Sequence, residues 1–113
     1  MRLSQISYDI NTNQLYNFVG ILIKIEAEKT IVKLDRDIIM QNFKIGDPVT
    51  NMVVEGIIWN RQVRLNSELL NRSVMLKQFK ISNYKDTLNL NTTFKSEIIV
   101  HDLFRESEYK WKP

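Results

Sequence analysis

The sequence predicts an all-β domain: a small barrel or split barrel of about six strands with a short C-terminal helix or arm. Two observations lead to this fold class. Isoleucine is abundant and Ala27 is the only alanine, which favours strand over helix. Apolar residues also alternate with period two in short runs, and turn signals separate these runs roughly every 8–12 residues. No stretch rich in Pro, Gly or Ser divides the chain, so we expect one domain over 1–113.

The clearest predicted strand covers 16–26, where Val19, Ile21 and Ile23 share one face. A short polar break at 27–29 follows, and the alternation resumes over 30–34. Two such runs separated by a tight polar turn are typical of a β-hairpin. We therefore expect these two strands to pair with each other.

The next segment, 35–43, is less regular and is expected to form a loop or one helical turn. Turn chemistry then appears at 44–48, because glycine accepts a positive φ and proline cannot donate to a central ladder. Residues 49–59 are strand-like, with Gly56 marking a bulge or a sharp bend. The alternation returns over 61–65, which predicts one more short strand.

The segment 67–79 fits either a helix or a strand. We favour a short helical or looped piece over 67–72 and a strand over 73–81. Residues 87–90 and 94–101 supply further strands, and 102–113 is expected to be the short helix or arm.

Composition excludes several functional classes. The chain has no cysteine, which removes disulfides, thiolate catalysis and zinc–thiolate sites. Its N-terminus lacks the apolar region of a signal peptide, and no apolar run is long enough to span a bilayer. We therefore expect a cytoplasmic protein, and the wealth of Ile, Asn and Lys suggests an AT-rich bacterial or phage genome.

Groups that support catalysis are scarce. His101 is the only histidine, and three glycines in all exclude a phosphate-binding loop and a dinucleotide fingerprint. We expect no enzyme activity, no cofactor and no metal site. A small hydrolase that uses His101 remains a remote alternative.

One segment, 59–85, is basic and carries aromatic residues. The segment contains six cationic residues and a single acidic one, Glu68, so the net charge of the segment, +5, exceeds the +3 of the whole chain. Cations with interleaved aromatics suit phosphate contacts and base stacking. The alternative is that Trp59 and Phe79 belong to the core and the cations form an ordinary solvated face. The candidate ligand or nucleic-acid residues are Trp59, Arg61, Arg64, Arg72, Lys77, Phe79, Lys80, Tyr84 and Lys85.

The order of elements resembles the N-terminal barrel that precedes PilZ domains in bacterial flagellar-brake proteins. The similar segments are 19–25, 44–49 and 55–58, and the stretch 72–82 is similar to an eroded arginine-rich junction of that family. The resemblance implies a barrel whose junction and following domain bind cyclic di-GMP. The R-x-x-x-R spacing and the D/N-x-S-x-x-G motif of the family are both absent from this sequence.

Two functions follow as hypotheses. The first is a non-catalytic binding or regulatory module that contacts another protein or a second copy of itself, since edge strands of a barrel invite pairing. The alternative is a barrel that binds nucleic acid or a nucleotide similar to cyclic di-GMP on its basic aromatic face.

Overall fold

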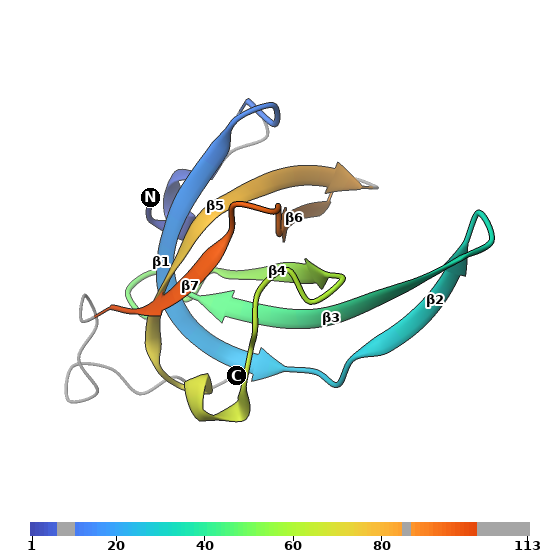
Figure 1. Cartoon of the computed structure of the whole chain (residues 1–113). Coiled ribbons are helices and arrows are strands. Elements are labelled where there is room, and N and C mark those ends of the chain that lie inside the picture. Colours follow the sequence, from blue (N-terminus) through green and yellow to red (C-terminus); the bar gives the residue numbers. More distant parts are fainter. Residues whose placement is uncertain (7–10, 85–86, 102–113) are drawn as a thin grey trace.

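The computed structural model describes residues 1–6, 11–84 and 87–101 (Figure 1). Almost all of the regular structure in these ranges is strand. None of the described helices is long and apolar enough to cross a membrane. The elements, in chain order, are the 3-10 helix η1 (Leu3–Gln5), β1 (Leu15–Ile25), β2 (Lys29–Lys33), β3 (Arg36–Gly46), β4 (Val53–Trp59), the 3-10 helix η2 (Ser67–Leu69), β5 (Ser73–Tyr84), β6 (Thr87–Asn91) and β7 (Glu97–Val100).

Five of the strands close into a barrel, which confirms the predicted all-β fold class. The order around the barrel is β1-β3-β4-β6-β5, and β5 pairs with β1 to close it. Neighbouring strands are antiparallel except β4 and β6, which are parallel. The remaining two strands lie outside the ring, since β2 pairs with β3 and β7 pairs with β5.

The core fills the barrel with large apolar side chains. Phe43 and Phe79 are buried and meet edge to face, with ring centroids 6.3 Å apart. Gly56 lies directly under the Phe43 ring, because a Cβ atom at this position would be 2.1 Å from the Phe43 Cζ. The predicted bulge at Gly56 was wrong: β3 and β4 pair without a shift along the whole of β4. The glycine is needed here to make room for an aromatic ring.

The N-terminal segment packs against the core, with Leu3 fully buried. Next to it, the Arg2 guanidinium donates two hydrogen bonds to the buried Asp47 carboxylate, at 2.9 and 2.8 Å. Burial by itself raises the pKa of Asp47, but hydrogen bonds from Arg2, Val49 and Thr50 outweigh it. The pKa of this carboxyl is therefore lowered from its ordinary value.

The predicted hairpin between the strands at 16–26 and 30–34 is wrong, because the hairpin is formed by the second of these strands and the one after it. The strand β2 pairs with β3, while β1 pairs with the later part of β3 and with β5. The segment 35–43, expected as a loop or helical turn, lies almost wholly within β3. The turn between β2 and β3 is Leu34-Asp35, with φ of 52° and 61°. Two successive positive φ values define a type I′ turn, which usually contains Gly or Asn, so this turn could not be recognised from its residues.

Other element boundaries agree with the sequence in part. The strand expected from residue 49 begins at 53, and residues 61–65 form no strand. The short helical piece is confirmed as η2, and the Asn66 side chain caps it by accepting a hydrogen bond from the backbone N–H of Glu68. The strands expected near 73, 87 and 94 are confirmed as β5, β6 and β7. The predicted C-terminal helix or arm lies outside the described residues.

Candidate functional site

Alternation along β3, β4 and β6 divides their side chains between the core and one outward face. The strand register sets Phe43 beside Gly56, and both face the core. The next row faces outward and runs from Asn42 of β3 to Ile57 of β4 and then to Asn91 of β6. The outward row combines amide groups with an apolar centre, a composition that suits a polar organic ligand.

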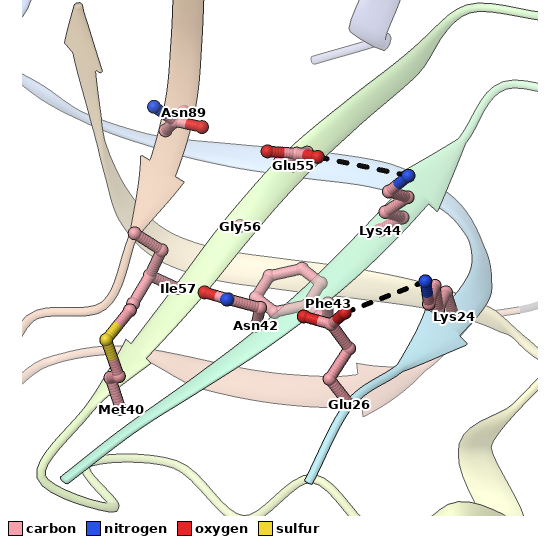
Figure 2. A pocket seen from close by; sticks show the side chains of 10 residues that line it. All are labelled: Lys24, Glu26, Met40, Asn42, Phe43, Lys44, Glu55, Gly56, Ile57 and Asn89. Carbon is pink, nitrogen blue, oxygen red and sulfur yellow. Dashed lines mark ion pairs between the residues drawn. The ribbon is translucent and has the colours of Figure 1, made fainter. Parts of the chain in front are cut away.

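A shallow groove of about 320 Å³ lies on this outward face (Figure 2). Two ion pairs border it, Lys24–Glu26 at 3.6 Å and Lys44–Glu55 at 3.9 Å. All four charged side chains are at least two-fifths exposed, so water screens both pairs. The lining as a whole is electrically balanced and comes from β1, β3, β4 and β6 and the residue after β1: Lys24, Glu26, Met40, Asn42, Phe43, Lys44, Glu55, Gly56, Ile57 and Asn89.

Two amide side chains in the groove have free hydrogen-bonding capacity. Asn42 and Asn89 are half-buried, and neither side chain forms a hydrogen bond with any residue that the structure describes. An amide offers a carbonyl acceptor and two N–H donors, a pattern that matches the edges of nucleobases. The pair can therefore bind a ligand that carries both donors and acceptors.

Trp59 ends β4 and lies opposite Met40, which lines the groove. The indole ring is half-buried, and its Nε1–H donates a 2.9 Å hydrogen bond to Asn91 Oδ1. Asn91 is fixed in turn, because its Nδ2 donates to Ser82 Oγ at 2.6 Å. This chain of hydrogen bonds holds the ring in one orientation and leaves part of it exposed to solvent.

A second hollow of about 450 Å³ lies beside the base of the β2–β3 hairpin. Arg61 there donates two hydrogen bonds to Glu28, at 2.8 and 3.3 Å. The hydrogen bond from Arg61 lowers the pKa of Glu28, and the one to Glu28 raises the pKa of Arg61. Arg64 also lines this hollow and forms no ion pair within the described part of the chain.

The structure separates the residues that the sequence grouped as one basic aromatic face. Phe79 has no exposed surface and belongs to the core, so it cannot contact a ligand. Lys80 is exposed on β5 and lies beside Asn91 in the register, next to the outward face. Arg72 is exposed before β5 begins, and Lys77 is half-buried next to β7. The Tyr84 side chain and Lys85 lie outside what the structure describes.

Sequence reasoning missed most of the groove. Its polar members come from β1, β3, β4 and β6 and from the residue after β1, and all of them lie outside the segment 59–85. The available signal was the alternation itself, because 42–44 and 89–91 each place a polar residue on either side of an apolar one, which marks the outward and the inward side of a strand. Because 35–43 was expected to form a loop or one helical turn, the alternation in β3 was not recognised. His101, the residue of the hydrolase alternative, follows β7 and donates its backbone N–H to the Ser73 carbonyl oxygen.

Comparison with known proteins identifies the fold. No protein-family model and no curated protein matches the chain. Solved structures do match. The OB domain of Ta0387 from Thermoplasma acidophilum is 12% identical with a TM-score of 0.67, over 92% of this chain and 88% of that one. The second OB-fold domain of replication protein A from Methanococcus maripaludis is 10% identical with a TM-score of 0.62, over 94% and 100%. The fold is that of an OB domain.

A third OB-fold neighbour is a replication protein A heterotrimer solved bound to ssDNA. It is 16% identical with a TM-score of 0.74 over 95% of this chain, which spans only 25% of the matched chain. These neighbours correct the resemblance to the PilZ-associated barrel. The short runs that suggested it, 19–25 and 55–58, lie in the strands β1 and β4 of the OB barrel.

Proposed function

We propose that this OB domain binds single-stranded nucleic acid on the outward face of β3, β4 and β6, without catalysing a reaction. The observation that carries the proposal is the groove on that face, with the exposed part of a fixed Trp59 ring beside it. In OB folds, the face of the second and third barrel strands binds oligonucleotides. Here these strands are β3 and β4. The fold neighbour that was solved bound to ssDNA supports nucleic-acid binding over the hypothesis of a protein-binding module.

Stacking on Trp59 is the first contact of the proposed complex. A nucleobase stacked on an aromatic ring contributes about 1–3 kcal/mol, with little dependence on sequence. Because Asn91 already holds the indole, the ring loses little freedom when a base stacks on it. Asn42 and Asn89 then supply donors and acceptors for the edges of the bases that lie in the groove.

Phosphate contacts come from lysines that are paired in the free protein. Lys24 and Lys44 are held by carboxylates at 3.6 and 3.9 Å, and exposed pairs of this kind contribute only about 0–1 kcal/mol. A phosphate can therefore replace the carboxylate at little cost. Since few cations border the groove, we expect a shallow salt dependence, with log K falling by about 0.7 per log unit of salt for each phosphate contacted.

The test is fluorescence anisotropy of a labelled single-stranded oligonucleotide. We expect Trp59→Ala to weaken binding about ten-fold or more, since one stacked base is lost, and Trp59→Phe to retain most of the affinity. Phe94→Ala is the matched control, because Phe94 is an exposed aromatic in the turn before β7 and should leave the affinity unchanged. No binding by the wild-type protein at low salt contradicts the function. Equal affinities of wild type and Trp59→Ala contradict the assigned face.

A further inference from the structure

Two strands of the molecule have only one strand neighbour among the described residues. The strand β2 pairs with β3 alone, and β7 pairs with β5 alone. Each open edge carries apolar surface, with Val32 on β2 73% exposed and Ile99 and Val100 on β7 exposed by 41% and 46%. An open edge presents backbone N–H and C=O groups that can pair with another strand. Figure 1 shows β2 and β7 on opposite sides of the molecule, so they cannot pair within one copy.

The β2 edge has a defined hydrogen-bonding pattern. The type I′ turn at Leu34-Asp35 makes Lys33 and Arg36 the closing pair of the hairpin. Backbone groups of Lys33 therefore point toward β3, and the direction alternates along the strand. The residues whose N–H and C=O groups point toward solvent are Thr30 and Val32.

The backbone N–H and C=O groups of β7 alternate in direction as those of β2 do. The backbone N–H of His101 donates to the Ser73 carbonyl oxygen at 2.9 Å, so His101 and every second residue before it point toward β5. The residues that direct their backbone groups away from β5 are Ile98 and Val100. Both edges therefore offer two outward-pointing residues separated by one position.

We propose that this domain also binds a second copy of itself, with β2 of one copy pairing antiparallel with β7 of the next. In the register that matches the outward-pointing residues, Val32 lies opposite Ile98 and Thr30 lies opposite Val100. The same register sets Lys33 opposite Glu97. It joins opposite charges at one end, two apolar side chains next to them, and a β-branched pair, Thr30 with Val100, beyond; cross-strand pairs of these kinds stabilise a sheet.

Other registers and partners fit less well. Shifting the strands by two residues in one direction removes the Lys33–Glu97 pair and sets Ile31 opposite Glu97. Shifting them in the other direction sets Asp35 opposite Glu97, two like charges. Pairing all of β2 with the same strand of a second copy sets Lys29 opposite Lys33 twice, which is also repulsive. Of these four arrangements, the β2–β7 register described is the one that combines charge attraction with apolar contact.

Because the two edges differ and lie on opposite sides, the contact is head to tail. Each copy keeps one free edge after pairing, so the assembly extends as a row of copies unless rotation closes it into a ring. None of the residues that line the groove lies on β2 or β7, so the two pairing strands do not form part of it.

Sedimentation of the protein without nucleic acid tests the proposal independently of its function. We expect the average mass of the wild type to rise above the 13.4 kDa of one chain as concentration increases. Lys33→Glu and Glu97→Lys should each weaken the association about ten-fold, since either change sets like charges opposite each other. Lys80→Glu is the matched control, because Lys80 lies in β5 between two neighbouring strands, and this variant should associate as the wild type does.

The decisive result is rescue. A mixture of Lys33→Glu and Glu97→Lys proteins, or one chain with both changes, restores opposite charges at the contact and should regain the wild-type average mass. A wild type that stays at the mass of one chain at all concentrations overturns the proposal. So does a mixture that fails to regain association when the wild type associates.

Discussion

The barrel and the β2–β3 ribbon share one strand but are stabilised in different ways. The second half of β3 lies in the barrel and alternates between core and groove, whereas its first half lies in the ribbon, where no residue is fully buried. The ribbon tip also carries unfavourable features: Leu34 has a φ of 52° and is 89% exposed, and Lys33 lies opposite Arg36. Burial therefore constrains the residues of the barrel, while the ribbon can carry residues that stability alone would not select.

The largest expected effect comes from emptying the barrel core. We expect Phe43→Ala to lower the free energy of unfolding by about 3–5 kcal/mol, because the ring fills the space above Gly56 and against Phe79. The matched change in the ribbon, Val32→Ala, should alter it by less than about 0.5 kcal/mol. Chemical denaturation measures both. Similar losses in the two variants contradict the contrast between the regions.

The Arg2–Asp47 pair gives the next largest effect. Arg2→Met leaves a buried carboxylate without its cation and should cost about 2–3 kcal/mol at neutral pH. The folded pKa of Asp47 is lowered, so the contribution of the pair is present above about pH 4 and is lost as the pH falls through the folded pKa. Stability curves of both proteins at several pH values check this. A difference that does not shrink in acid contradicts the assignment.

The smallest effect is expected from changing the turn at the tip of the ribbon. Replacing the turn residues by Leu34→Asn and Asp35→Gly provides the sequence that type I′ turns prefer. We expect the amide hydrogens of β2 to exchange about five-fold more slowly, equivalent to about 1 kcal/mol of added hairpin stability. Amides in β5 should exchange at the wild-type rate. Faster exchange in β2 contradicts the assigned turn.

The sequence predicts the parts of the fold that depend on alternation. The apolar runs at 16–26 and 73–81 are strands because one of their faces must be buried, and this periodicity is visible without a structure. The strand β3 was not predicted, because its residues 38–40 are three successive apolar residues without alternation and its turn has neither Gly nor Asn. Pairing of β2 with β3 is decided by that turn rather than by composition.

The candidate site was predictable only in part. Trp59 was named from its basic aromatic surroundings, and it does lie next to the groove. Phe79 was named for the same reason but is buried, since charge and aromatic content do not show which way a side chain points. Asn42 and Asn89 come from strands far apart in the sequence, and the parallel pairing of β4 with β6 brings them to one face. Long-range pairing of this kind leaves no local signal.

The most direct measurement is a titration of isotope-labelled protein with a single-stranded oligonucleotide, followed by NMR of backbone amides and of the Trp59 indole. We expect the shifts to concentrate on the Trp59 indole and on outward residues of β3, β4 and β6, including Asn42 and Asn89, while β7 is unchanged. Shifts that gather elsewhere, on β7 or the N-terminal segment, or an absence of shifts at low salt, contradict the claim that this face binds nucleic acid.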